Sequence, residues 1–280
     1  MTNYAGKIVA IQGERASFHD IAARQFFGAN LKPVGYGTFT QIFEALADNQ
    51  ADQALVAIEN SLYGSINEVY DLLLKHKLWI SGEMYLRVEQ CLVGMPGATI
   101  VGINEVHSHP VALAQCEKYL DTTLARAMRF EHHDTAGSVV DIKRWNDPAK
   151  AAIASREAAQ LHGMTVLARE IETNKQNYTR FVVLRQKTTE ATTEKATKTS
   201  LILQTEDKPG ALYQALGVLA DKGINLTKLQ SRPVIGRAWH YIFYVDVDSG
   251  LHDARLQAAL RELKAQDCAA TILGSYRSSR

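Results

Sequence analysis

The stretch NYTRFVVL, residues 177–184, places a hydroxyl and a permanent cation directly before four apolar residues. The apolar run is typical of a buried strand, so Thr179 and Arg180 stand where that strand begins. Periodicity alone favours a strand start with a surface arginine. A rigid strand can also hold a hydrogen-bond donor and a cation in fixed positions, and a planar guanidinium suits a bound carboxylate.

Small hydroxyl or helix-capping residues also stand at four predicted strand-to-helix junctions. The junctions are ASFH with Ser17, ENSLYGS with Asn60, Ser61 and Ser65, HSHP with Ser108 and His109, and HDTAGS with Thr135 and Ser138. A helix N-terminus attracts anions because its first N–H groups are unpaired. Such ends gather at one edge of an open α/β sheet. Each junction alone is typical of an ordinary N-cap, but the four together indicate a site for a small polyanion.

Other chemistries fit the sequence less well. His107, His109, His132 and His133 lack the HExxH spacing and have no cysteine partner, so we expect no metal site. The chain contains no GxSxG, P-loop or GxGxxG motif. Cys116 follows a helical pattern and is expected in a core.

The residues that precede position 186 alternate between strand and helix patterns. Strand-like runs are KIVAIQG, ALVAIEN, KAAIAS and RFVVLRQ, and helical runs include FHDIAARQFFG, SINEVYDLLLKHK, HSHPVALAQCEKYL and REAAQLHG. We expect Pro110 at the first position of its helix and a capping box of Ser65 with Glu68. This alternation predicts an α/β architecture with helix-covered sheets.

A second domain is predicted after a polar segment. The segment QKTTEATTEKATKT, residues 186–199, is rich in Thr, Lys and Glu and has no apolar periodicity, so it is interpreted as a linker. The residues that follow it read strand, helix, strand, strand, helix, strand. That βαββαβ order is the ferredoxin-like pattern.

Bulk properties exclude several classes of protein. The net charge is +1, so no electrostatic argument favours nucleic acid or an anionic membrane surface. No apolar run approaches the length of about 18 residues that a membrane span needs. Three widely spaced cysteines argue against a disulfide framework and suit the cytoplasm.

These pieces together resemble the prephenate dehydratase family. The matching segments, in the family's order, are ASFHDIAARQFF, VAIENSLYGSINEVYDLL, VHSHPVALAQCEKYL, HHDTAG, AAIASREAAQLHGM and NYTRFVVL. SHPxALAQC and TRF are the most specific of them. The second domain resembles an ACT regulatory domain through DKPGALYQAL and LQSRP.

The resemblance implies a specific domain organisation. A catalytic domain would cover 1–185 as two α/β lobes, like a periplasmic binding protein, with one lobe formed by 1–80 and 165–185 and the other by 81–164. The linker 186–199 and a βαββαβ ACT domain over 200–280 would follow. The protein would be a homodimer or homotetramer. Because the chain starts almost directly at its first strand, we expect the monofunctional form without a chorismate mutase segment.

The resemblance also implies the activity and its residues. The reaction would convert prephenate to phenylpyruvate in phenylalanine biosynthesis without a cofactor, and phenylalanine would inhibit it at the ACT domain. Thr179 would donate to the leaving hydroxyl, Arg180 would clamp a carboxylate or brace the loop, and Phe181 would pack below the site. Further substrate contacts are expected from Ser17, Asn60, Ser61, Ser108, His109 and Thr135. Effector contacts are expected from Pro209, Gly210, Ala211, Leu212, Gln230, Ser231, Arg232 and Pro233.

Two positions depart from the family pattern, and two other functions compete. Ala16 stands where a glycine is common, so the loop before Ser17 could differ in shape. Gln230 stands where a glutamate is usual, so control by phenylalanine could be weaker.

Arogenate dehydratase, which takes the aminated substrate, is the close rival, and no residue of the sequence decides between the two. A non-catalytic amino-acid sensor is disfavoured because Thr179 is present.

Overall fold

The computed structural model describes residues 6–187, 195–234, 236 and 240–279. The contacts divide the chain into two compact units, which are described separately. Unit 1 comprises Met1–Leu72 and Met84–Phe181, and unit 2 comprises Leu73–Glu83 and Val182–Arg280. Strands β5 (Trp79–Arg87) and β11 (Tyr178–Arg185) and the helix over Asn67–His76 run through both. Part of the predicted linker over 186–199, namely residues 188–194, lies outside the described residues, and the predicted domain boundaries stay predictions.

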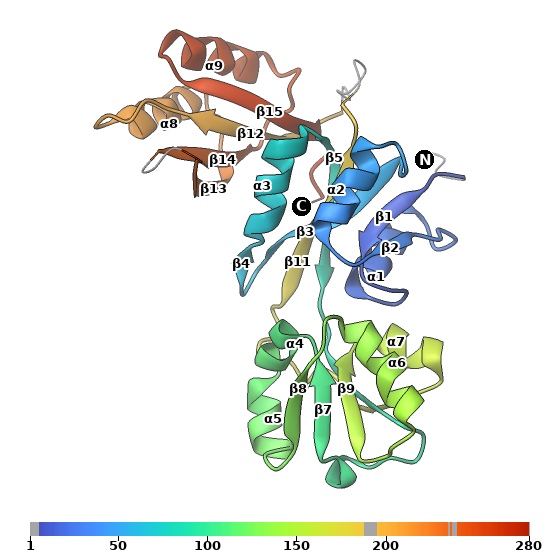
Figure 1. The fold of residues 1–280 in the computed structure, drawn as a ribbon. Coiled ribbons are helices and arrows are strands. Elements are labelled where there is room, and N and C mark those ends of the chain that lie inside the picture. Colours follow the sequence, from blue (N-terminus) through green and yellow to red (C-terminus); the bar gives the residue numbers. More distant parts are fainter. Residues whose placement is uncertain (1–5, 188–194, 235, 237–239, 280) are drawn as a thin grey trace. The chain divides into compact units, whose positions relative to one another are not determined.

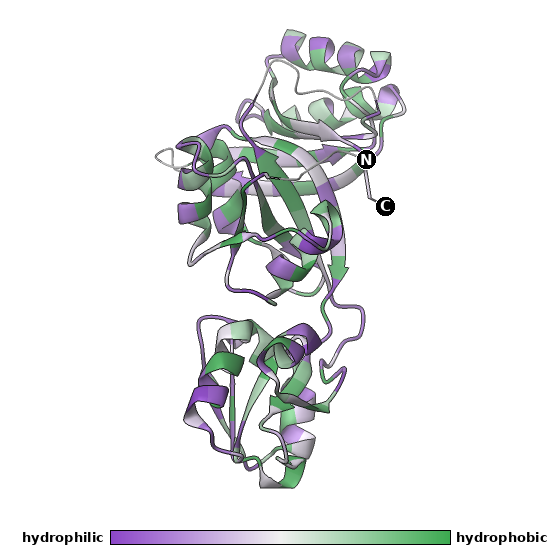
Figure 2. Cartoon of the chain, turned by 90° about the vertical axis from the view of Figure 1, so that its right-hand side faces the viewer, coloured by the Kyte–Doolittle hydropathy of each residue, from purple (hydrophilic) through white to green (hydrophobic). Residues whose placement is uncertain are grey.

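The first lobe of unit 1 is built on strands in the order β11-β3-β1-β2 (Figure 1). Its elements are β1 (Val9–Gln12), α1 (Phe18–Phe27), β2 (Val34–Tyr36), α2 (Phe39–Ala47), β3 (Gln53–Asn60), β4 (Gly64–Ser65) and α3 (Asn67–His76). β1 pairs in parallel with both β2 and β3. α1 and α2 both pack on β1 and β3. The strand interiors are apolar (Figure 2), as expected for parallel strands covered by helices.

Local capping chemistry explains where these helices begin. The Ser17 hydroxyl accepts a hydrogen bond from the Asp20 N–H at 3.3 Å, which caps α1. α3 begins at Asn67, and Ser65 lies in β4, where it pairs with Glu59. The capping box of Ser65 with Glu68 stays a prediction.

The second lobe of unit 1 has helices on both faces of a five-stranded sheet (Figure 1). The sheet order is β10-β6-β9-β7-β8, with β6 (Cys91–Gly94), β7 (Glu105–Ser108), β8 (Met128–Glu131), β9 (Lys150–Ala154) and β10 (Thr165–Ala168). The helices are α4 (Pro110–Gln115), α5 (Glu117–Thr123), α6 (Thr135–Trp145), α7 (Arg156–His162) and the short η1 (Ile100–Gly102). Pro110 is the first residue of α4, as predicted.

Two buried clusters flank this sheet because alternate strand residues face opposite sides. Cys91 and Ala152 pack with Val139 of α6 in one cluster. Leu92 and Ile153 pack with other residues, including Leu120 of α5, in the second. The chain passes between the two lobes twice, after β5 and before β11. The N–H of Val88 donates to the carbonyl of Asn177 at 2.8 Å where these two segments meet.

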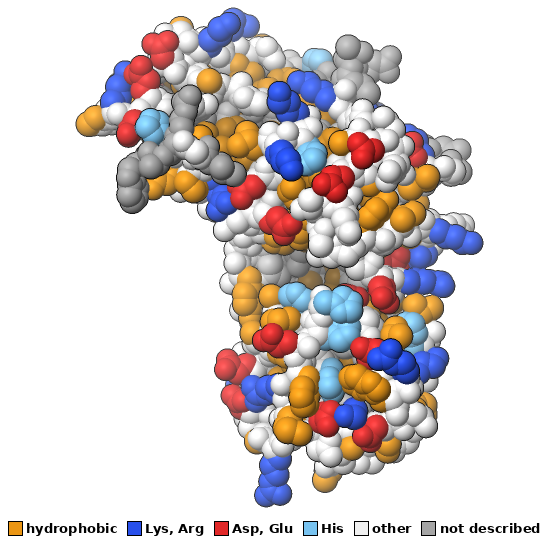
Figure 3. Space-filling model, viewed as in Figure 1, with side chains coloured by type: hydrophobic (Ala, Val, Ile, Leu, Met, Phe, Trp, Pro, Cys, Tyr) orange, Lys and Arg blue, Asp and Glu red, His pale blue; other side chains and the backbone are white. Residues whose placement is uncertain are grey.

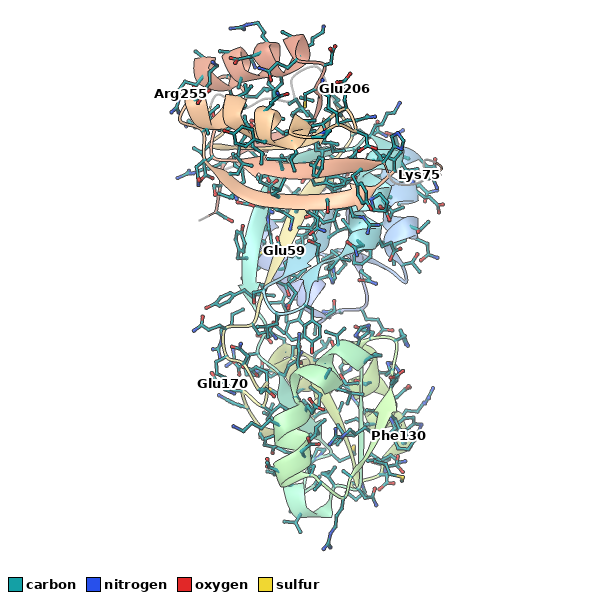
Figure 4. All side chains as sticks on the ribbon, turned by 90° about the vertical axis from the view of Figure 1, so that its left-hand side faces the viewer. Glu59, Lys75, Phe130, Glu170, Glu206 and Arg255 are labelled. Carbon is teal, nitrogen blue, oxygen red and sulfur yellow. The ribbon has the colours of Figure 1, made fainter. Side chains whose placement is uncertain are left out.

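Unit 2 contains the predicted βαββαβ arrangement. Its elements are β12 (Lys198–Gln204), α8 (Ala211–Asp221), β13 (Leu226–Pro233), β14 (Tyr241–Val247), α9 (Ala254–Ala265) and β15 (Ala269–Tyr276). The strand order is β13-β14-β12-β15, and the two helices lie together on one face of that sheet (Figure 4). Leu203, Leu219 and Leu263 belong to the core between them.

Strand β5 adds to the edge of this sheet beside β15. Gly274 pairs with Ile80 in parallel, and a Cβ at Gly274 would meet the Ile80 carbonyl oxygen at 2.1 Å. Only glycine fits this close approach of two backbones. The predicted fold class, a two-lobed α/β domain followed by a ferredoxin-like domain, is therefore confirmed. No helix in the described part of the chain has both the length and the apolar character to cross a membrane.

Candidate active site

Unit 1 contains a cavity of about 910 Å³ whose wall is formed by residues from both lobes. Six of the predicted site residues line it, and they come from β3, β11, α6 and the N-cap positions of α1 and α4. They are Ser17, Asn60, His109, Thr135, Thr179 and Phe181. The structure thus brings together residues up to 164 positions apart in sequence (from Ser17 to Phe181).

The alternation of β11 separates the residues of the TRF motif. Thr179 and Phe181 line the cavity, whereas Arg180 between them is buried on the other side of the strand. An Arg180 guanidinium nitrogen lies 3.9 Å from the Glu59 carboxylate, and Glu59 is labelled in Figure 4. Successive strand side chains point to opposite faces, so Arg180 cannot share the position of Thr179. This arrangement favours bracing, the second of the two roles expected for Arg180.

Asn60 fixes the Thr179 hydroxyl. The Asn60 Nδ2 donates to Thr179 Oγ1 at 3.0 Å and to Asn177 Oδ1 at 2.8 Å. The Asn60 Oδ1 accepts from the N–H groups of Leu62 and Tyr63, at 2.9 and 3.1 Å. The amide therefore uses both protons and its oxygen, which holds it in one orientation. Because Thr179 Oγ1 accepts from Asn60, its own proton is left to donate to a second partner.

Ser61 and Ser108 do not line the cavity. The Ser61 Oγ donates to the Gln176 carbonyl at 2.8 Å and accepts from the Tyr178 N–H at 2.9 Å, so it holds the start of β11. The Ser108 Oγ is fully buried and donates to the Ile153 carbonyl at 2.6 Å. Both hydroxyls bind backbone groups that must be satisfied in a folded chain. Both hydroxyls therefore hold backbone segments together.

His109 and Thr135 both border the cavity at the start of a helix, but only His109 caps its helix. The His109 Nδ1 accepts from the Val111 N–H at 3.2 Å, and burial is the largest of the effects that lower the pKa of His109. Thr135 is the first residue of α6, but the N-cap is Asp134, whose carboxylate accepts from the Gly137 N–H at 3.0 Å. The Thr135 hydroxyl is thus not needed as a cap.

His19 is a cavity residue that the sequence analysis missed. Its Nε2 accepts from the Ala57 N–H at 3.2 Å, so the neutral ring carries its proton on Nδ1. The ring stands edge-on to Phe181 with centroids 5.0 Å apart. Burial lowers the pKa of His19 to about 4. The imidazole is therefore a neutral donor near neutral pH, and its position two residues after Ser17 on α1 was the available signal.

Arg15, also missed, supplies positive charge. It is the one lysine or arginine among the described residues that line the cavity. It lies in the loop GERASF, where no periodicity marks it. The next residue, Ala16, has a φ of 67°, a left-handed conformation that glycine adopts more readily. The Ala16 carbonyl accepts from Ser155 Oγ at 2.8 Å, so this loop contacts the second lobe.

Gln90 and Gln115 complete the polar wall on the side of the second lobe. Both are buried and line the cavity, and the Gln90 Nε2 donates to Gln115 Oε1 at 3.0 Å. Gln115 belongs to the SHPxALAQC motif but was not singled out, and Gln90 stands just before the run CLVGM without a motif of its own. Their meeting depends on the packing of α4 against the chain that follows β5.

Two histidines of the second lobe, His107 and His132, contact carboxylates. Figure 3 shows histidine side chains gathered on one face of this lobe. The His107 Nε2 lies 3.1 Å from Glu105, and its ring stacks on Phe130, labelled in Figure 4. The His132 Nε2 lies 3.0 Å from Asp141. Among the described residues, no group of three or more His, Cys, Asp or Glu side chains is arranged to hold a metal ion.

The predicted effector residues lie in unit 2. Gly210 is the N-cap of α8, has a φ of 81° and offers no side chain there. Pro209, Ala211 and Leu212 flank it. Gln230, Ser231, Arg232 and Pro233 are the last residues of β13. Their binding of an effector stays a prediction.

Comparisons with known proteins agree with this architecture. A family model described as "Prephenate dehydratase" matches residues 9–189, and one described as "ACT domain" matches residues 199–265. The curated "Arogenate dehydratase/prephenate dehydratase 2, chloroplastic" of Arabidopsis thaliana is 39% identical over 277 residues, which cover 96% of this chain and 72% of that protein.

Two solved structures are similar along almost the whole chain. One, titled "GqqA- a novel type of quorum quenching acylases", has a TM-score of 0.88 and 34% identity and covers 98% of each chain. The other, a prephenate dehydratase in complex with L-Phe from Arthrobacter aurescens, has a TM-score of 0.87 and 29% identity and covers 97% of this chain and 90% of that one. The chain belongs to the prephenate dehydratase family and carries an ACT domain after the dehydratase region.

Proposed function

We propose that the cavity of unit 1 catalyses the decarboxylating dehydration of prephenate to phenylpyruvate. The observation that carries this proposal is the hydrogen bond from Asn60 to Thr179, which leaves the threonine proton to donate into the cavity. The reaction needs such a donor because a hydroxide must leave. It needs no nucleophile, since formation of the aromatic ring drives the fragmentation.

The bonds and charges of the reaction balance with one added proton. The bond between the ring and its carboxylate breaks and releases carbon dioxide. Its electron pair enters the ring, and the opposite carbon–oxygen bond breaks. The departing hydroxide takes up a proton and leaves as water. A neutral threonine is a poor acid, so Thr179 acts as a hydrogen-bond donor whose contribution grows as negative charge develops on the oxygen.

The other cavity residues have complementary roles in this proposal. Arg15 attracts the side-chain carboxylate, because a guanidinium can contact it with two donors. The ring lies near Phe181 and His19, whose edge-to-face contact makes a rigid apolar surface. A carboxylate against such a surface loses hydration, which favours its departure as carbon dioxide. Ser17, His109 and Thr135 are further polar groups on the wall.

Incubation of the purified chain with prephenate, followed by detection of phenylpyruvate, tests the activity. Thr179→Ala is the matched variant, expected to lose turnover while its circular dichroism spectrum and melting temperature stay close to those of the parent. Near-normal turnover in this variant would remove Thr179 from the mechanism. Absence of phenylpyruvate with the parent chain would refute the activity itself.

We further propose that phenylalanine inhibits the enzyme by binding unit 2 near Gly210. The support is the similar structure named as a complex with L-Phe and the open N-terminus of α8, an 11-residue helix at which a carboxylate can accept backbone N–H bonds. Calorimetry and the assay with added phenylalanine test this. Binding without inhibition, or neither, would leave unit 2 without a feedback role.

The oligomeric state and the compartment belong to the same proposal. We expect a homodimer or homotetramer in the cytoplasm, and the three cysteines are all free and buried, as suits a reducing compartment. Size-exclusion chromatography with light scattering measures the mass directly. A monomer at working concentration would contradict the expected assembly.

A further inference from the structure

The Asp20 carboxylate is a buried charged group that the proposed mechanism does not use. Asp20 is 3% exposed. Its Oδ2 accepts from the Ala16 N–H and from Arg24 Nε, both at 2.9 Å, and its Oδ1 accepts from the same Arg24 nitrogen at 3.0 Å. Because the guanidinium binds both oxygens, the carboxylate is held in one orientation. It therefore ties the first turn of α1 to the loop that precedes this helix.

Ala16 is the residue that this carboxylate holds. Its φ of 67° is a left-handed conformation, which a residue with a Cβ keeps only where its surroundings impose it. Its carbonyl accepts from Ser155 Oγ at 2.8 Å. Its methyl group belongs to the buried cluster that contains Val139 and Ala158 of the second lobe. The second lobe thus fixes the carbonyl and the side chain of Ala16, and Asp20 fixes its buried N–H.

Arg15 directly precedes Ala16, and its side chain borders two cavities. One is the cavity of about 910 Å³ that holds the proposed site. The other has a volume of about 460 Å³, and Asp20 and Arg24 are in its wall. Without an acceptor for the Ala16 N–H, rotation of the peptide between Arg15 and Ala16 would turn this N–H toward water and relieve the left-handed φ. The same rotation would change ψ of Arg15 and redirect its guanidinium.

We propose that Asp20 is a positioning residue for substrate binding, because its hold on the Ala16 N–H keeps Arg15 directed at the cavity where the substrate carboxylate binds. The inference rests on the proposed dehydratase activity and deepens it. Asp20 itself does not line that cavity, so it acts through the loop. Thr179 lies on β11, and its hydroxyl is fixed by Asn60 rather than by this loop. Loss of Asp20 should therefore raise KM and leave kcat almost unchanged.

Asp20→Ala tests the proposal with prephenate as the substrate. We expect KM to rise by about tenfold and kcat to stay within about threefold of the parent. Asp20→Asn keeps one oxygen for the Ala16 N–H, so its KM should stay within about threefold of the parent. Asp52→Ala is the matched control, because Asp52 Oδ2 also accepts a backbone N–H, that of Ile8 at 2.8 Å, and Asp52 does not line the cavity. Both of its kinetic constants should stay within about threefold of the parent.

The double variant Asp20→Ala/Arg15→Met separates a positioning role from a merely structural one. If Asp20 acts through Arg15, the double variant has the same KM as Arg15→Met alone, because the guanidinium that Asp20 directs is already absent. Independent effects would multiply to a rise of about a hundredfold and would overturn the inference. An unchanged KM in Asp20→Ala, or the same rise in Asp20→Asn as in Asp20→Ala, would overturn it as well.

Hydrogen exchange measured by NMR gives a readout that does not depend on turnover. The Ala16 N–H should exchange about tenfold faster or more in Asp20→Ala, while the N–H groups of β1 keep the rates of the parent. Unchanged exchange at Ala16 would overturn the inference. Absence of phenylpyruvate with the parent chain would instead refute the dehydratase activity, and the exchange rate would still decide whether Asp20 holds the loop. If Asp20→Ala does not fold, Asp20→Leu, which has a similar length and no acceptor, should show the same changes in KM and in exchange.

Discussion

Asn60 Nδ2 lies 3.0 Å from Thr179 Oγ1, although 119 residues separate the two in sequence. The amide is held by three further hydrogen bonds, to Asn177, Leu62 and Tyr63. It therefore acts as a fixed donor to the hydroxyl. The direction of this bond determines where the threonine proton can point, and the first prediction follows from it.

Thr179→Val replaces the hydroxyl with a methyl group of similar size. It should lower kcat by about 10²–10³-fold, which is the usual effect of removing a donor that stabilises a transition state.

Asn60→Asp keeps an oxygen for Leu62 and Tyr63 but replaces the donor with an acceptor. Thr179 would then donate to the new carboxylate rather than to substrate, so kcat should fall by a similar factor. Steady-state kinetics measure both, and Thr179→Ser is the control that retains the hydroxyl. Normal kcat in Asn60→Asp would mean that the orientation of the threonine proton does not matter.

The two arginines near the site should respond differently to replacement. Arg180→Met removes a buried cation on the face of β11 opposite Thr179 and should lower the free energy of unfolding by roughly 1–3 kcal/mol, with little change in kcat/KM at a temperature where the variant is folded. Arg15→Met removes an exposed cation from the cavity wall and should raise KM by about tenfold, with stability almost unchanged. Urea denaturation and kinetics on both variants decide this. The reverse pattern would make Arg180 the substrate clamp.

His19 should make the stability of the protein depend on pH. Its pKa in the folded chain is about 4, below the ordinary 6.5. Between these values the unfolded histidine binds a proton and the folded one does not. The contribution of His19 to the free energy of unfolding is therefore fully present above about pH 6.5 and is lost as the pH falls toward 4. The loss is at most about 3 kcal/mol. Solvent in the cavity reduces it further, since the ring is only half-buried. His19→Gln keeps an acceptor for the Ala57 N–H and should flatten this part of the curve of unfolding free energy against pH. An unchanged slope would assign the dependence to other groups.

Removal of one partner of a buried ion pair in unit 2 should lower the free energy of unfolding more than removal of both partners. Lys198 Nζ lies 2.7 Å from Glu83 Oε1, and both side chains are almost fully buried. Glu83 Oε1 also accepts from Ser278 Oγ and the Ser279 N–H. Lys198→Met removes this ammonium from the buried carboxylate and should lower the free energy of unfolding by about 3–5 kcal/mol, whereas adding Glu83→Leu should recover part of that loss. Additive effects in the double-mutant cycle, measured by urea denaturation, would show that the two groups do not interact.

Local patterns in the sequence were enough to predict several helix starts and the order of the elements in unit 2. Ser17 caps α1 and Pro110 opens α4 because the first turn of a helix has the same unpaired N–H groups wherever it occurs. The βαββαβ order of unit 2 followed from apolar periodicity and turn residues in the same way. Ser65 shows the limit of such signals, since it lies in β4 and pairs with Glu59, a contact that no local pattern predicted.

The sequence by itself determined which elements form and which polar residues stand at their ends. Only the tertiary structure decided which of these residues meet. The β11 register turned Thr179 into the cavity and Arg180 away from it, and the double crossing between the lobes placed Gln90 opposite Gln115. Burial then set the neutral state of His19. Strand register, chain crossings and burial depend on contacts between distant parts of the chain, so no local pattern could have specified them.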